Sequence, residues 1–143
     1  IYCFNRGPEA LKKKYKGDPI HLLGSGSIMQ QVINAQKALI DQGIPTDVWS
    51  VTSYNLLHKD YVDCQQSHAE PFLVQALKNE SGHFIAVSDY MRLLPDSLAH
   101  LFPGNFISLG TDGYGLSESR EELRNYFGIS TESIVNKVVE ITK

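Results

Sequence analysis

A strand–loop–helix–strand pattern over residues 19–51 constrains the fold of this chain more than any other feature. A short apolar run at residues 20–23 is broken by Gly-Ser-Gly-Ser, and apolar residues then recur at helical spacing until Gly43. Residues 47–51 read as a second strand. Two strands joined by a helix in this way pair in parallel, and the helix packs on their sheet. The pattern therefore predicts an α/β fold.

The rest of the chain continues the alternation of strands and helices. Further strands are predicted at residues 83–87 and 106–109, and residues 2–4 suit either a strand or the tail of an upstream segment. Helical patterns cover residues 52–67, 71–77, 91–101, 119–127 and 130–141. A length of 143 residues is typical of one domain. We expect that domain to span residues 19–143, with residues 1–18 a linker or the remnant of a preceding domain.

Composition and charge argue against several classes of protein. The net charge of −3 disfavours nucleic acid as the main partner, and no apolar run approaches the ~18 residues that a membrane span needs. The sequence shows no signal-peptide pattern. Cys3 and Cys64 are far apart and lack metal-site spacing, which favours a reduced, cytoplasmic protein. The lysines of residues 12–16 are expected to form a solvated patch. A chain that begins at Ile1 rather than Met is expected to be a fragment or a processed product.

The Gly-Ser-Gly-Ser turn at residues 24–27 invites a dinucleotide-binding interpretation. The third glycine of that motif is absent, because Met29 takes its place. The next strand ends in Ser50, Thr52 and Ser53 instead of the acidic residue that would bind a ribose hydroxyl. The pattern favours a tight turn whose small residues let the helix pack closely on the sheet. Anion capture by the helix N-terminus is the alternative.

A second glycine-rich loop, residues 110–115, also follows a strand. Thiamine diphosphate enzymes hold magnesium with a Gly-Asp-Gly segment and a later asparagine, but here Asn125 is too close to Asp112 and Asn136 lies inside the last helix. After the strand at residues 83–87, Asp89 is a candidate helix cap, and Arg92 a candidate partner for a carboxylate.

Polar residues from these two loops should meet, because parallel strands bring their carboxyl ends to one edge of a sheet. We assign this group a structural or interface role, and we predict no catalytic, cofactor-binding or metal-ligating residue in the chain. The group comprises Asp89, Arg92, Thr111, Asp112 and Gly113.

Four segments carry a family resemblance. In chain order they are LLGSGSI, DVWSVTSYNLL, SDYMRLLPDSL and LGTDGYGLSESREELRNYF. They closely resemble the C-terminal domain of the homodimeric, bacterial-type pyruvate dehydrogenase component, within the transketolase-like group. The resemblance runs from about Pro19 to the C-terminus. It departs from the family between Cys64 and Phe72, where this chain is shorter, and before Lys16, where the match is poor.

The resemblance implies a three-layer α/β/α sandwich around a five-stranded, mostly parallel sheet with one antiparallel strand. It also implies a non-catalytic domain that completes a subunit and its homodimer. The full-length enzyme of that family uses thiamine diphosphate and magnesium to decarboxylate pyruvate, and it acetylates lipoyl groups of the acyltransferase component. The implied partners are the preceding domains, the second subunit and that acyltransferase, without nucleic acid or membrane.

Two alternatives stay open at this point. One is the C-terminal domain of another thiamine diphosphate enzyme, such as transketolase or another 2-oxo-acid dehydrogenase. The other is a free-standing nucleotide- or anion-binding module that uses residues 24–27 and 110–115. An excised domain should also expose apolar side chains that its sister domains once covered. The expected contributors are Tyr2, Phe4, Tyr54, Leu56, Tyr90 and Tyr114.

Overall fold

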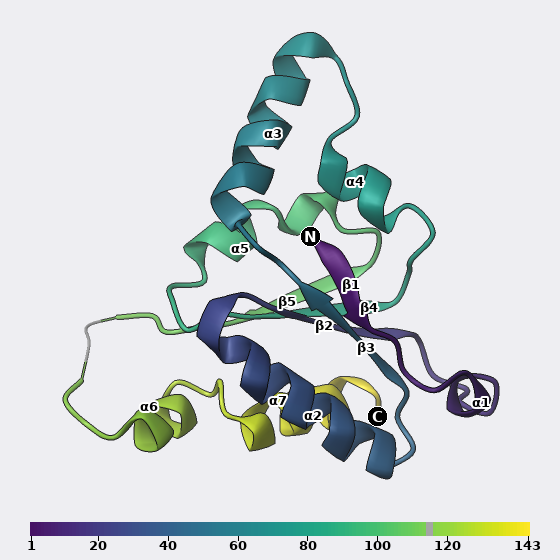
Figure 1. The fold of residues 1–143 in the computed structure, drawn as a ribbon, viewed down its shortest axis with the longest axis vertical. Helices are drawn as coiled ribbons and strands as arrows, with labels where there is room; N and C mark the ends of the chain where they lie inside the picture. The colour runs from purple at the N-terminus through teal and green to yellow at the C-terminus, as the bar shows by residue number, and fades with distance from the viewer. Residues whose placement is uncertain (114–115) are drawn as a thin grey trace.

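A five-stranded sheet of order β1-β3-β2-β4-β5 forms the centre of the molecule. The computed structural model describes residues 1–113 and 116–143, and Figure 1 shows their arrangement. The strands are β1 (Tyr2–Asn5), β2 (Ile20–Gly24), β3 (Thr46–Ser50), β4 (His83–Val87) and β5 (Asn105–Leu109). β2 pairs in parallel with β3 and β4, β4 pairs in parallel with β5, and β1 runs antiparallel to β3. The predicted mostly parallel sheet with one antiparallel strand is confirmed.

Helices cover both faces of the sheet, which confirms the three-layer sandwich (Figure 1). One face is covered by α2 (Met29–Asp41), which follows the short 3-10 turn η1 (Gly26–Ile28), and by α7 (Thr131–Ile141). The other face is covered by α3 (Tyr54–Ser67), α4 (Phe72–Leu77), α5 (Leu93–Ser97) and the 3-10 turn η2 (Ala99–Leu101). Two short helices, α1 (Glu9–Lys12) and α6 (Arg120–Tyr126), lie at opposite ends of the molecule.

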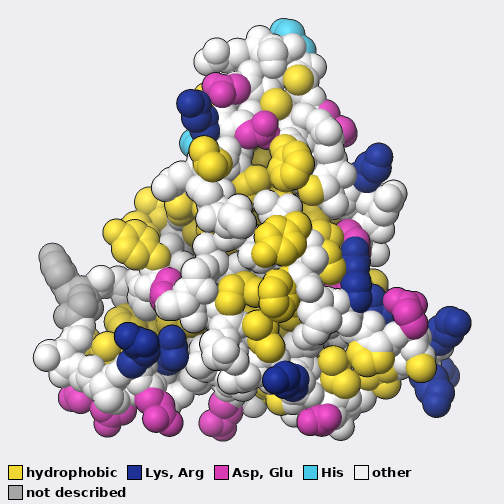
Figure 2. Space-filling view, in the orientation of Figure 1, with side chains coloured by type: hydrophobic (Ala, Val, Ile, Leu, Met, Phe, Trp, Pro, Cys, Tyr) yellow, Lys and Arg dark blue, Asp and Glu magenta, His cyan; other side chains and the backbone are white. Residues whose placement is uncertain are grey.

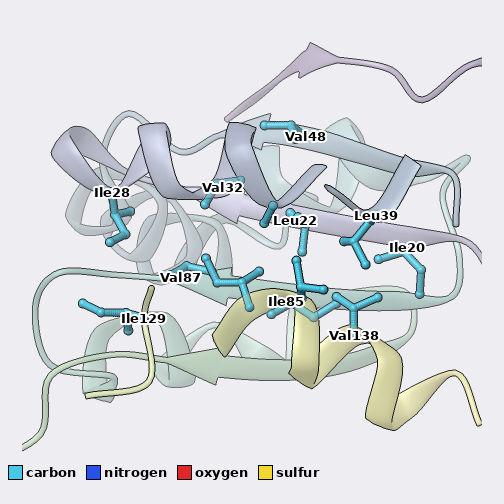
Figure 3. Close-up of a cluster of buried hydrophobic side chains, with 13 residues drawn as sticks. Ile20, Leu22, Ile28, Val32, Leu39, Val48, Ile85, Val87, Ile129 and Val138 are labelled. Atoms are coloured by element: carbon cyan, nitrogen blue, oxygen red, sulfur yellow. The ribbon is translucent and has the colours of Figure 1, made fainter. Parts of the chain in front are cut away.

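The central strands are buried on both sides, as parallel strands between helices must be. Side chains alternate between the faces. One face presents Leu22, Val48 and Ile85, and the other presents Leu23, Trp49 and Ala86. Figure 3 shows Val32 and Leu39 of α2 and Val138 of α7 packed against the first set. Each such side chain contributes about 1.5–3 kcal/mol through burial, so this packing holds the layers together.

The exposed apolar residues largely match the expected set. Tyr2, Phe4, Leu56 and Tyr90 are between 51% and 71% exposed. The prediction was wrong for Tyr54, which is 6% exposed. Tyr114 lies outside the described residues.

The start of α3 explains the burial of Tyr54. The Ser53 hydroxyl accepts a hydrogen bond from the Leu56 backbone N–H at 3.2 Å and so fixes the first turn of the helix. Tyr54 and Leu57, three residues apart, then face the sheet, whereas Leu56 points to solvent. Tyr54 is therefore buried, although it begins the helix, because it lies on the helix face that packs against the sheet.

The helical segment predicted at residues 91–101 is shorter and interrupted. Its regular part is α5, in which Pro95 lies within the first turn, and η2 follows after Leu98. Proline is tolerated in the first turn because its missing N–H has no intrahelical partner there. None of the helices in residues 1–113 and 116–143 has the length and apolar character needed to cross a membrane.

The first 18 residues contribute β1 and α1 to the structure. β1 occupies one edge of the sheet, with Tyr2 opposite Ser50 and Cys3 opposite Trp49. Gly7 then lies against the start of β3, where an added Cβ would be 2.9 Å from the Thr46 nitrogen. The division of the chain into residues 1–18 and 19–143 stays a prediction.

Candidate functional site

The carboxyl edge of the sheet contains a topological switch point between β2 and β4. β2 leads into α2 on one face of the sheet, whereas β4 leads toward α5 on the other. Loops that diverge in this way leave a crevice, which is where open α/β sheets bind ligands. Here the Ser27 hydroxyl donates a hydrogen bond of 2.5 Å to the Asp89 carboxylate and so bridges the two loops.

The turn after β2 packs closely on its helix, as the sequence predicted. A Cβ on Gly24 would lie 2.5 Å from the sulfur of Met29 and 3.1 Å from a methyl group of Val32. Gly26 adopts a φ of 62°, in the left-handed region that favours glycine. Gly24 therefore allows close packing of α2 on the sheet, and Gly26 allows the tight turn.

The five residues assigned to the carboxyl edge are brought together. Arg92 donates to Asp112 through Nε at 2.5 Å and through its backbone N–H at 3.1 Å. The Thr111 hydroxyl donates to the Asp89 carbonyl at 3.3 Å, and Gly113 follows with a φ of 100°. The backbone N–H of Arg92, and then its guanidinium, lower the pKa of Asp112. The predicted gathering is confirmed for the described part of the loop.

One local hypothesis about this edge was wrong. Asp89 does not cap the following helix, because α5 begins at Leu93 and its N-cap residue, Arg92, makes no side-chain capping bond. Asp89 instead accepts from Ser27, on the far side of the crevice. The carboxylate is satisfied by a neighbouring loop that sequence spacing did not identify.

Asp112 does not fit the role of a magnesium ligand in a thiamine diphosphate site. Both of its carboxylate oxygens accept hydrogen bonds from Arg92. A magnesium ion would have to displace the positively charged guanidinium before it could bind there. The two bonds from Arg92 to Asp112 therefore tie the loop after β4 to the loop after β5.

The segment after β4 also presents an apolar surface. Tyr90, Met91 and Leu93 are between 46% and 72% exposed, and they lie beside hollows formed with the first turn of α3. Figure 2 shows further hydrophobic side chains gathered around β1 and the amino terminus. Contiguous exposed apolar groups of this kind are typical of a contact surface.

A second polar cluster, at the opposite edge of the sheet, was not predicted. The buried Asp47 carboxylate accepts hydrogen bonds from Arg6 at 2.7 Å, Lys12 at 3.0 Å and the Gly7 backbone N–H at 2.7 Å. Arg6 continues to Glu80 at 2.7 Å. Burial raises the pKa of Asp47, but the bonds from Lys12, Gly7 and Arg6 outweigh it and lower the pKa below its ordinary value. The expected solvated lysine patch thus includes one lysine, Lys12, that binds a buried carboxylate.

His21 extends this cluster into the sheet. Its Nδ1 accepts a hydrogen bond from the Trp49 indole at 3.1 Å, so the proton of the neutral ring lies on Nε2, 3.0 Å from the Ser81 carbonyl. The ring stacks on Phe84 at a centroid distance of 4.5 Å. Burial lowers the pKa of His21 and favours this neutral form.

His21, Asp47 and Glu80 have the spacing of a metal site but not its electrostatics. Their ligand atoms lie within 4.8 Å of one another beside a cavity of about 200 Å³. Arg6 and Lys12 already neutralise the two carboxylates. A divalent cation would have to displace both side chains, so the cluster is structural. Its signal in the sequence was His21 inside the otherwise apolar β2, together with Asp47 beside Val48 and Trp49 in β3.

Comparison with known proteins gives consistent results. The family model described as "Transketolase-like TK C-terminal domain" matches residues 7–130. The pyruvate dehydrogenase E1 component of Mycobacterium tuberculosis is 38% identical over 149 residues, which cover 98% of this chain and 16% of that protein. The same component of Mycolicibacterium smegmatis is 33% identical, with the same 98% and 16% coverage. Among solved structures, transketolase from Leishmania mexicana superposes with a TM-score of 0.62 at 18% identity, over 90% of this chain and 17% of that one.

Proposed function

The chain belongs to the family of transketolase-like C-terminal domains, and on that premise we propose that it is the C-terminal domain of a pyruvate dehydrogenase subunit. The observation that carries the proposal is the similarity to pyruvate dehydrogenase E1 components along 98% of the chain. The chain spans about 16% of the length of these relatives. The rest of the length of these relatives is sufficient for the cofactor-binding domains that we propose for the full-length subunit.

The activity we propose for the whole subunit is decarboxylation of pyruvate followed by acetylation of a lipoyl group. Thiamine diphosphate with magnesium would supply the carbanion chemistry, and the preceding domains would hold both. The residues described above fit a supporting role, since Asp112 is bound to Arg92 and Asp47 to Arg6 and Lys12. We place the subunit in the cytoplasm, as part of a complex with the acyltransferase component.

The exposed surface after β4 is the proposed contact with the rest of the subunit or with a second subunit. Tyr90, Met91 and Leu93 supply apolar area, and the Arg92–Asp112 pair fixes the loop that carries them. Arg92 and Asp112 follow the carboxyl ends of the paired strands β4 and β5. Their bond therefore holds the apolar side chains at this edge of the sheet, where neighbouring domains would meet. The domain would complete the dimer in this way without touching the reacting atoms.

Reading the coding sequence upstream of Ile1 is the first test. We expect an open reading frame that encodes a Gly-Asp-Gly segment followed by an asparagine, as the magnesium site of a thiamine diphosphate enzyme requires. The subunit expressed from that frame should decarboxylate pyruvate as a dimer. An in-frame stop codon close to Ile1 would contradict the proposal.

The second test concerns the contact surface in the expressed subunit. Tyr90→Ser combined with Leu93→Ser should weaken dimerisation measured by sedimentation, because it removes exposed apolar area. Tyr126→Ser is the matched control, since Tyr126 is 72% exposed and Tyr90 71%. An unchanged dimer in the double variant would show that this surface is not the interface.

A further inference from the structure

A hollow of about 310 Å³ at the carboxyl edge contains two arginines. Arg120 and Arg124 lie one turn apart on α6 and both line the hollow, so they project from the same side of the helix. Ser27 and Thr111 place hydroxyl groups in the same lining. Their arrangement joins the turn after β2, the loop after β5 and α6.

Neither arginine is committed to a partner within residues 1–113 and 116–143. No side-chain hydrogen bond and no ion pair engages either guanidinium there. By contrast, Arg6 is bound to the Asp47 carboxylate and Arg92 to the Asp112 carboxylate. A guanidinium offers a planar fork of donors that matches a phosphoryl or carboxylate group.

The charges around the hollow favour an anion on one side of the arginine pair. Asp89 is the carboxylate of this lining, and it already accepts from Ser27. A neighbouring hollow shares both arginines but is lined by Glu121 and Glu132, which would repel an anion. In addition, α2 and α7 both begin at this edge, as the bond from the Thr131 N–H to Gln31 shows. The start of α7 lines the neighbouring hollow, whereas Ser27, in the turn that leads into α2, lines this one, so the positive end of the α2 dipole lies near the arginine pair.

Part of the lining of the hollow is apolar. It is formed by Leu123, Phe127 and Ile129, of which Ile129 is only 2% exposed. A bare inorganic anion would leave this wall uncovered, whereas the organic part of an ester would pack against it. The pairing of two arginines with an apolar wall thus indicates a group with a charged end and an apolar body.

We infer that this hollow binds a small molecule carrying a phosphoryl group, held by Arg120 and Arg124. The two arginines lie on α6 and are not among the residues of the proposed contact surface at Tyr90.

Calorimetric titration of this chain with inorganic phosphate and with phenyl phosphate at low ionic strength tests the inference. We expect saturable binding with a Kd on the order of 1 mM or below, because salt screening is weak under these conditions. Arg120→Gln and Arg124→Gln should each weaken binding by about tenfold, the effect of one lost charge-assisted hydrogen bond. Lys137→Gln is the charge-matched control, because Lys137 pairs with Glu140 on α7 and does not line the hollow.

The two probes separate the sources of the phosphoryl group. Tighter binding of phenyl phosphate would identify an organic ester, and equal binding would identify free phosphate; both results require the arginine dependence. Absence of saturable binding for both probes, or equal weakening by Lys137→Gln and Arg124→Gln, would overturn the site. Far-UV circular dichroism of each variant shows that it is folded. The result is independent of pyruvate decarboxylation, so its failure would leave the proposed function standing.

Discussion

Asp47→Asn is the most informative single change in this structure. The substitution removes the charge that Arg6 and Lys12 neutralise, while the remaining amide oxygen can still accept from the Gly7 N–H. Removing one partner of a fully buried ion pair costs about 3–5 kcal/mol. Asp47 is 5% exposed, but Arg6 is 46% and Lys12 29% exposed, so water can solvate both cations after the change. The expected loss is therefore smaller, about 2 kcal/mol.

Urea unfolding at pH 7, followed by circular dichroism, measures this loss. For a domain of this size about 2 kcal/mol corresponds to a fall in Tm of roughly 4–8 °C. Asp41→Asn is the matched control, because Asp41 is an exposed carboxylate at the end of α2. It should change the free energy of unfolding by no more than about 0.5 kcal/mol. An Asp47→Asn variant as stable as this control would refute the argument.

The pH dependence supplies an independent check. The folded-state pKa of Asp47 is lowered, so its contribution is present above the ordinary carboxyl pKa of about 3.9 and is lost as pH falls through the lowered value. The stability difference between wild type and Asp47→Asn should be constant from neutral pH down to about pH 5, and it should shrink below about pH 4. A difference that persisted undiminished in strong acid would show that charge is not its cause.

Three further predictions follow from the structure. Gly82→Ala should cost more than about 2 kcal/mol in urea unfolding, because φ is 98° and the new Cβ would lie 2.2 Å from the Pro19 carbonyl oxygen; near-wild-type stability would contradict this. Because the pKa of His21 is lowered, its contribution to the free energy of unfolding is complete above about pH 6.5 and declines as pH falls toward the lowered pKa. The fluorescence of Trp49, which donates to His21, should change over the same pH range in the wild type and stay constant in His21→Gln. Calorimetric titration of this chain with thiamine diphosphate and magnesium should show no micromolar binding; saturable binding abolished by Asp112→Ala would assign the loop to the cofactor.

The α/β alternation was predictable from the sequence because it is encoded locally. Apolar runs of strand length and a helical period between them fix β2, α2 and β3, and the cap at Ser119 fixes the start of α6. Ser119 accepts from the Glu122 N–H at 3.2 Å, as an N-cap serine does, and its hydroxyl also donates to the Glu122 carboxylate at 2.7 Å. Such contacts join residues only a few positions apart, so the pattern alone carries the information.

Contacts between distant segments were much harder to predict. Arg6 meets Glu80 across 74 positions, and Ser27 meets Asp89 across 62. No local spacing encodes these pairs, because they depend on the order of strands in the sheet. That Arg92 and Asp112 lie close together was predictable only because both follow parallel strands. The same rule did not specify which side chains at this edge would bond to each other.

The antiparallel edge strand sets an order on how the chain folds. Among the strands of this domain β1 is made first, yet its pairing partner, β3, begins at Thr46, and the Arg6–Glu80 bond must wait for a residue that is later still. The residues of β1 therefore leave the ribosome before the strand of this domain with which they pair, while β2, α2 and β3 can assemble among themselves as soon as they emerge. The first strand of the domain is thus among the last to be paired. An unpaired β1 would present an open strand edge beside the rings of Tyr2 and Phe4, which are half exposed even in the folded domain, and this combination favours misassembly.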